Sequence, residues 1–161
     1  MAVEMFLDIK GVKGESKASG FVDKIDIFSF SFGASNPSQS AVGGGMGAGK
    51  VSLSSISFQK VVDNATPELF HGCCTGTHYD TATITVREAG GDNPVSYLVI
   101  DLGTVMVDSI SWGGASGGDK PSESLSLAYS TIKITYTDQD AHGKGQKGPE
   151  FGWNIKANTK L

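Results

Sequence analysis

A glycine-rich stretch is the first place where this sequence could hold a reactive ligand. Residues 43–50 read GGGMGAGK, and Gly44, Gly49 and Lys50 have the spacing of a phosphate-binding P-loop. The next residue is Val51, where a P-loop has the serine or threonine that binds magnesium, and a strand pattern follows where a helix should begin. The sequence therefore argues against a nucleotide site. The stretch is either a flexible loop or a contact loop, because long loops in compact domains are often functional.

Cysteine and histidine side chains offer a second possibility, a metal site or an activated nucleophile. His71, Cys73 and Cys74 could be imagined as metal ligands. The two cysteines are adjacent, however, so they lack the two-residue separation that lets both thiolates reach one tetrahedral ion. His78 lies near Asp80, but no Gly-x-Ser-x-Gly turn presents a serine to them. We therefore expect no metal, no cofactor and no enzymatic activity. A hydrolase that uses a serine with His78 is the weakest of the readings that the sequence allows.

Two serines in an aromatic strand form the third pattern of interest. Phe28, Phe30 and Phe32 alternate with Ser29 and Ser31, so a strand here would carry phenylalanine on one face and serine on the other. The serine face either meets water in the ordinary way or forms a small, uncharged contact surface. The sequence leaves both possibilities open.

The elements that position these residues are predicted to be mostly strands. Residues 3–9 and 81–88 alternate apolar and polar side chains in the manner of half-buried strands. Three other segments, 25–32, 51–58 and 125–136, begin with apolar residues at odd positions and continue with apolar residues at even ones. A slip of one residue moves the apolar set to the other face, so each segment carries a bulge or bends to serve two surfaces. This favours a compact β-barrel or two-sheet barrel.

One short helix is expected in this mainly β chain, over about residues 66–76 (TPELFHGCCTG). Thr66 can cap the first turn, and Gly76 can adopt the left-handed conformation that ends a helix. Leu69 and Cys73 are four residues apart, so one face of the helix is expected to pack on the sheet as a plug.

The strand that follows Pro94 is apolar on both faces. The sequence YLVIDL includes Tyr97 and Val99 on one face and aliphatic residues on the other, which is typical of a strand covered on both sides. A second covering layer must come from this chain or from another copy of it. The strand pattern leaves both sources open.

Composition limits the classes of partner. The 161 residues are enough for a single domain, residues 1–161, with extended loops. The 13 Lys and Arg and 17 Asp and Glu are dispersed and give a net charge of -4, so neither nucleic acid nor an anionic membrane is an expected partner. The chain has no apolar run long enough to span a membrane, and its start lacks the pattern of a signal peptide. The two adjacent cysteines exclude a disulfide scaffold, which indicates folding in a reducing compartment.

Segments spread along the whole chain resemble, in order and in spacing, the haemolysin-coregulated proteins, the tube subunits of the bacterial type VI secretion system. These segments are MAVEMFLDIKGVKGES, DKIDIFSFSFG, GGGMGAGKVSL, SFQKVVDNATPEL, GTHYDTATITVREAGG, YLVIDLGTVMVDSISWGG and the closing GWNI. The resemblance implies a β-barrel with one helix that assembles into a homohexameric ring. Rings would stack into a hollow tube that carries effectors, and a contractile sheath would drive the tube and its spike protein out of the cell. Such a protein would be made in the bacterial cytoplasm and secreted without a signal peptide.

With this resemblance, the unexplained residues acquire expected roles. If the phenylalanine face packs inward, Ser29 and Ser31 are expected to line the lumen and contact effectors. The loop over 35–50 is expected to stack one ring on the next, and Tyr97 and Val99 are expected to face a neighbouring subunit. At the centre of the stacking loop are Gly43, Gly44, Gly45, Met46 and Gly47. The alternative is a monomeric barrel that binds a small ligand in an enclosed cavity.

Overall fold

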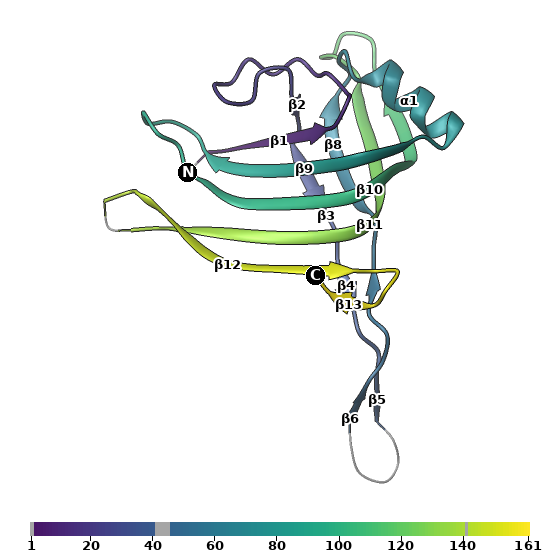
Figure 1. Ribbon diagram of the computed structural model, residues 1–161. Coiled ribbons are helices and arrows are strands. Elements are labelled where there is room, and N and C mark those ends of the chain that lie inside the picture. The colour runs from purple at the N-terminus through teal and green to yellow at the C-terminus, as the bar shows by residue number, and fades with distance from the viewer. Residues whose placement is uncertain (1, 41–45, 141) are drawn as a thin grey trace.

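The computed structural model describes residues 2–40, 46–140 and 142–161. For residues 38–40 and 46–48 it describes the backbone only. It consists of strands and a single helix within these residues (Figure 1). The elements are β1 (Val3–Ile9), β2 (Ile25–Asp26), β3 (Ser29–Ser31), β4 (Ala34–Ser35), β5 (Ser38–Ser40), β6 (Met46–Ala48), β7 (Ser52–Leu53), β8 (Ile56–Val61), α1 (Thr66–Thr75), β9 (His78–Glu88), β10 (Ser96–Gly113), β11 (Ser122–Gln139), β12 (Gly145–Asn154) and β13 (Thr159–Lys160).

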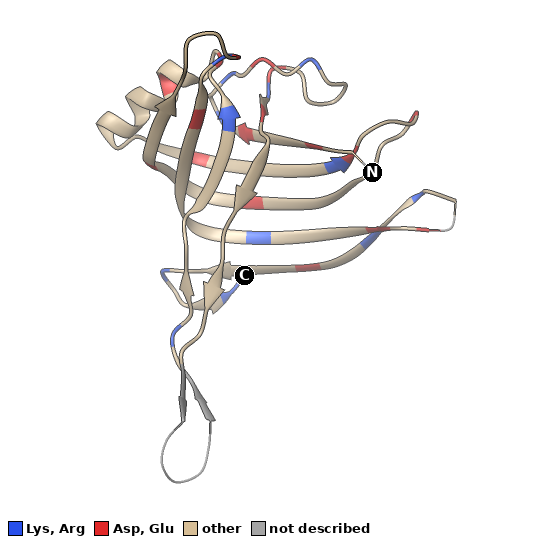
Figure 2. Ribbon diagram, turned by 180° about the vertical axis from the view of Figure 1, so that it is seen from behind, with Lys and Arg blue, Asp and Glu red and all other residues tan. Residues whose placement is uncertain are grey.

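Most of the strands belong to one strongly curved sheet of nine strands. Its main path runs β13-β12-β11-β10-β9-β1-β2, and β8 adds to β11 with β3 beside it. The two longest strands, β10 and β11, pair with each other along almost their whole length and curve through the molecule (Figure 1). Two small ladders, β4 with β7 and β5 with β6, extend away from the sheet as one hairpin (Figure 1). Figure 2 shows the β4–β7 ladder from behind, where it also leads away from the sheet.

The sheet is not closed into a barrel by strand pairing. Its path ends at β2 on one side and at β13 on the other. The gap between β1 and β8 is spanned instead by the covalent chain of residues 25–31, because the amide of Ile27 donates to Met5 of β1 and the amide of Phe28 donates to Gln59 of β8. The expectation of a mainly β fold with one helix is therefore confirmed, whereas the expectation of a barrel is wrong in its closure.

Each predicted change of phase lies where a strand changes its partner. The segment 25–31 passes from β1 to β8, and the segment 52–61 passes from β7, which pairs with β4, to β8. In β11, residues 122–127 pair with β8, whereas residues 131–139 pair with β12. The apolar residues switch parity at these points because the side chains that face the core change sides there. The prediction that these segments serve two surfaces is confirmed.

The sequence suggested that the phenylalanines of the 28–32 segment share one buried face, but they do not. Phe30 and Phe32 are half-buried and pack against the core, but the side chain of Phe28 is 64% exposed. The reason is the transfer from β1 to β8: Phe28 lies at the crossing point, one residue after the buried Ile27. Ser29 and Ser31 nevertheless lie on the exposed side of β3, opposite Phe30.

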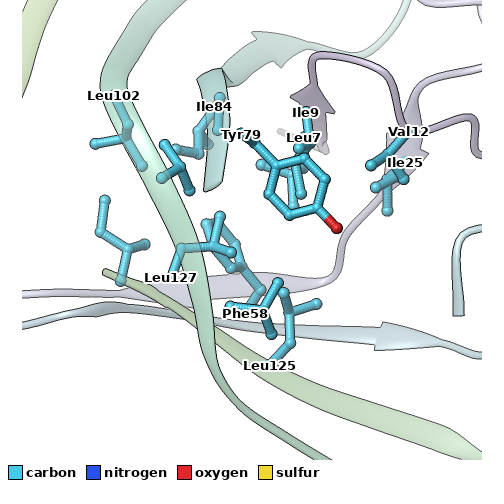
Figure 3. Packing of buried hydrophobic residues seen from close by; sticks show 14 of the residues in the cluster. Leu7, Ile9, Val12, Ile25, Phe58, Tyr79, Ile84, Leu102, Leu125 and Leu127 are labelled. Atoms are coloured by element: carbon cyan, nitrogen blue, oxygen red, sulfur yellow. The ribbon is translucent and has the colours of Figure 1, made fainter. Parts of the chain in front are cut away.

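The core lies inside the fold of the sheet and is filled mostly by aliphatic side chains from most of its strands, together with Phe58 and Tyr79 (Figure 3). Phe6 faces the other side of β1, where an apolar side chain was unexpected. The ring of Phe21 stacks on it at 4.2 Å between centroids, and the guanidinium of Arg87 lies over both rings. The loop that follows β1 therefore covers a second, smaller apolar layer.

Helix α1 begins at Thr66, one residue earlier than it would if Thr66 were its N-cap. Ala65 occupies the cap position, and Thr66 is the first helical residue, so the predicted capping role of Thr66 is wrong. Its hydroxyl accepts instead from the amide of Asp63 in the preceding turn. Gly76 ends the helix at φ 67°, as predicted. Leu69 and Gly72 are buried where α1 packs against the sheet, which confirms the plug.

A buried ion pair joins the strands to the helix. Lys60 of β8 and Glu123 of β11 are both fully buried, and the Lys60 ammonium donates to the Glu123 carboxylate. It also donates to Asp63 at 2.9 Å and to the carbonyl of Val61 at 3.0 Å, just before α1. On the other side of the pair, Trp112 of β10 donates its indole N–H to Glu123 at 2.8 Å. The charges are therefore compensated by hydrogen bonds from three strands and the turn before the helix.

Lys60→Met should lower the free energy of unfolding by about 3–5 kcal/mol, because it leaves the buried carboxylate of Glu123 without its cation. Denaturant unfolding at a fixed protein concentration measures this loss. Lys24→Met is the matched control, since Lys24 pairs with Asp8 at the surface, where an ion pair contributes less than about 1 kcal/mol. A Lys60→Met variant as stable as the control would contradict the stabilising role of the buried pair.

Candidate assembly surfaces

Ser29 and Ser31 belong to a larger polar surface that spans four strands. The register places Ser29 beside Gln59, Ser124 and Ser111 in one row across β3, β8, β11 and β10. A second row across the same strands contains Ser31, Ser57, Ser126 and Ser109. We call these eight residues the serine face. Seven of the eight positions are serine and the eighth is Gln59, so the side chains at these positions are mostly small and all uncharged.

Hydrogen bonds connect neighbouring strands within the serine face. The hydroxyl of Ser124 donates to the side-chain oxygen of Gln59 at 2.8 Å, and the hydroxyls of Ser109 and Ser126 lie 2.5 Å apart. Asp108, at the margin of the face, accepts from Ser126 and, at 2.5 Å, from Ser55. The side chains are therefore held close to the sheet by one another, which leaves a low, even surface.

The opposite side of the same four strands is the core. Between the two serine rows, the register aligns Phe30, Phe58, Leu125 and Ile110 on the inner face. Phe58 and Leu125 are buried, and the other two pack against the cluster. The core therefore fixes the position of the serine face. Sequence reasoning found only the β3 serines; the alternation in SISFQ, SISW and SLSL was the signal for the others.

The described part of the predicted stacking loop, Met46 and Gly47, lies in β6 of the hairpin that extends away from the sheet (Figure 1). Gly43, Gly44 and Gly45 lie outside the described residues. Met46 and Gly47 begin β6, where they pair with Ser40 and Gln39 of β5. The backbone there is thus a β-ladder, which the glycine-rich sequence did not predict.

The two interface candidates, Tyr97 and Val99, lie away from the serine face. Val99 of β10 is half-buried and sits opposite Thr85 of β9 and Thr135 of β11. Tyr97 is half-buried at a bulge of β10 and lines a surface hollow of about 400 Å³ together with Tyr136. The structure brings neither residue to Ser29, Ser31 or the hairpin, so the predicted residues mark separate surfaces.

An apolar groove of about 500 Å³ lies at the open side of the sheet, between the base of the hairpin and strands β11 and β12. Phe32 and Leu53 line it from the hairpin side, and Ile134 and Trp153 line it from the sheet. The indole nitrogen of Trp153 is buried without a hydrogen-bond partner in the described residues. The groove adjoins the β13 end of the main sheet path, because Trp153 of β12 and Asn158, just before β13, both line it.

Two groups near these surfaces have shifted pKa values. Burial raises the pKa of Tyr129, whose hydroxyl donates to the carbonyl of Ser54 at 2.8 Å and so ties β11 to the turn before β8. Lys133, with Lys147 as the second contributor, lowers the pKa of the Glu150 carboxyl on β12. Glu150 therefore stays ionised at neutral pH.

The structure shows where the residues considered for chemistry lie. Asp80 pairs with Lys10 at 3.5 Å, and the exposed His78 makes no hydrogen bond to it. Cys73 is half-buried and Cys74 is exposed, both as free thiols. Within the described ranges, no three His, Cys, Asp or Glu side chains gather in a way that could hold a metal ion. Nor does the described part of the chain contain a helix with the length and apolar character needed to cross a membrane.

Comparisons with known proteins agree on one family. Residues 6–136 match the family model described as type VI secretion system effector, Hcp. The chain is 43% identical to the protein hcp1 of Pseudomonas aeruginosa over 161 residues, which is 99% of each chain. Its fold superposes on a solved type six secretion system protein with a TM-score of 0.93 at 28% identity, covering 99% of this chain and 100% of the other.

A second solved relative is Hcp1 from Salmonella typhimurium, with a TM-score of 0.82, 30% identity and full coverage of both chains. The family model covers well over half of the chain, and the sequence match spans almost all of it. The curved sheet, the hairpin and the helix described above are therefore the features of a shared fold. This chain belongs to the Hcp family of type VI secretion system tube proteins.

Proposed function

We propose that this chain forms hexameric rings that stack into a hollow tube, with the serine face lining the lumen and contacting effectors. The serine face is the observation that supports this role: four adjacent strands carry small, uncharged side chains outward and a filled core inward. A lumen wall that passes varied cargo needs few charged groups and no deep pockets, because a strong charge or an apolar pocket would bind some cargo too tightly.

The margins of the serine face support lateral contact between copies. Among the described strands, β3 pairs only with β8, and residues 107–113 of β10 pair only with β11. Both margins therefore offer free backbone edges, which readily accept another chain. Tyr97 and Val99 are proposed as a second, separate subunit contact, since half-buried apolar side chains gain from a neighbour that covers them.

The remaining parts of the proposal follow from family membership. The tube would act as a structural part and not as an enzyme, and it would need no cofactor. It would be made in the bacterial cytoplasm and driven out by the contractile sheath with the spike protein. Its other partners would be secretion effectors.

The decisive experiment is the solution mass by light scattering, followed by negative-stain imaging of the same peak. Six-fold rings with an open centre are expected. The apolar groove near Trp153 favours one competing function, a monomeric barrel that binds a small apolar ligand. A monomer at every accessible concentration would contradict the ring and support that alternative.

Ser31→Tyr should reduce effector retention at least several-fold while leaving the rings intact, because a large ring would project from the even surface into the lumen. Co-purification of an effector with the rings measures retention, and light scattering measures ring formation.

Ser19→Tyr is the matched control, since Ser19 is exposed but lies in the loop after β1 and not on the serine face. Unchanged retention by Ser31→Tyr, or an equal loss in the control, would remove the lumen assignment.

Deleting residues 43–47 should prevent stacking without breaking the rings, because these residues follow β5 in the chain and the deletion leaves every strand of the nine-stranded sheet intact. Sedimentation of stacked tubes and electron microscopy of the rings give the two measurements. Tubes of normal length from the deletion variant would count against a role for this loop in stacking.

A further inference from the structure

One charged side chain lies at the exposed surface of the strands that carry the serine face. The face is built from residues 29–31 of β3, 56–61 of β8, 107–113 of β10 and 122–127 of β11. These stretches contain three charged residues, Lys60, Asp108 and Glu123. Lys60 and Glu123 are buried and pair with each other, whereas Asp108 is exposed. Asp108 is therefore the one charge that these four stretches present to whatever the face contacts.

A β-bulge turns Asp108 toward the serine face. Val107 is buried opposite Leu127, and the register then shifts so that Ser109 lies opposite Ser126. Without a bulge, alternation would turn Ser109 back toward the core. The extra residue instead leaves Asp108 and Ser109 both on the exposed side of β10. Bulges are frequent next to functional sites, where they re-aim a side chain.

Serine hydroxyls orient the carboxylate of Asp108. Ser126 donates to one carboxylate oxygen, and Ser55, the residue before β8, donates to the other at 2.5 Å. A serine hydroxyl carries a single hydrogen, so the 2.5 Å contact between Ser109 and Ser126 is donated by Ser109. A chain of hydrogen bonds from β10 through β11 thus ends on Asp108. The carboxylate is held at both of its oxygens.

The oriented carboxylate of Asp108 can accept further hydrogen bonds from a partner. An ionised carboxylate has about four lone-pair sites, and the two serine hydroxyls occupy two of them. Cationic donors suit the other sites: a guanidinium binds a carboxylate through two parallel hydrogen bonds, and an ammonium binds it as a point charge. An anionic partner is repelled, and an apolar partner has to desolvate the charge. The chemistry of Asp108 therefore selects arginine and lysine.

We propose that Asp108 determines which cargo the serine face retains, by binding arginine or lysine side chains on the surface of the effector. This assignment rests on the proposed function, since it needs rings whose lumen the serine face lines. Six copies would place six carboxylates around each ring, and a wall with charges of one sign concentrates cations near it. Each exposed contact is weak, but several acting together hold a cargo and still release it.

The test compares two labelled peptides of equal length on the assembled rings, one of alternating arginine and serine and one of alternating glutamate and serine. Fluorescence polarisation measures the Kd of each peptide. The parent rings should bind the arginine peptide at least about tenfold more tightly, because several charged contacts form at once. Asp108→Asn should reduce this preference at least about fivefold, and added salt should reduce it in the parent rings, because ions screen exposed charges.

Asp80→Asn is the matched control, because it removes one carboxylate, 79% exposed, from β9, which lies outside the serine face. It changes the net charge by the same amount and should leave the preference as in the parent. Asp108→Glu keeps the charge and should retain most of the preference, which separates loss of the carboxylate from damage to the bulge. Light scattering measures ring formation in each variant.

The outcomes separate this inference from the proposed function. Absence of rings from the parent protein would overturn the proposed function and the inference with it. Rings that bind both peptides equally, that keep their preference in Asp108→Asn, or that lose it equally in Asp80→Asn would overturn the role of Asp108 while leaving the tube intact. Ser31→Tyr rings that bind the arginine peptide as the parent does would also overturn it, because the peptide would then bind outside the serine face.

Discussion

The buried ion pair between Lys60 and Glu123 is the constraint on which the rest of the structure depends. Two charges without solvent contact are tolerated only when hydrogen bonds satisfy them, and here these come from β8, β10 and the turn before α1. The pair thus fixes the register of β8 against β11, the start of the helix and the orientation of Trp112. The serine face rests on those same strands, so an internal electrostatic contact shapes two outer surfaces.

Much of the fold could be predicted because its strands carry their own pairing information. The shift of apolar parity near Ile27 and again between Leu127 and Ile132 marked the places where strands change partner, since a strand cannot change its buried face without moving its apolar residues. The helix end at Gly76 was equally local, because a left-handed residue there is read directly from the glycine.

Other features depend on residues far apart in the sequence and could not be predicted. Lys60 and Glu123 are 63 positions apart, and nothing in either neighbourhood indicates the other. The serine face required the register of four strands, so only its β3 portion could be proposed. Phe28 was placed inward by alternation, but the crossing from β1 to β8 turns it outward. The expectation of a closed barrel was wrong for the same reason, because pairing across the gap between β1 and β8 depends on the whole sheet and not on any one segment.

The covalent bridge of residues 25–31 has a consequence for how the chain folds. The bridge joins β1 to β8. β1 pairs with β9, and β8 pairs with β11, so each of these two strands finds its partner more than fifty residues further along the chain. During synthesis these early segments must wait, with unpaired edges, until their partners emerge. Contacts of such long range slow folding and prolong the exposure of aggregation-prone edges. The Hcp fold is therefore expected to reach its native state slowly, because β1 and β8 gain their partners only when β9 and β11 are available.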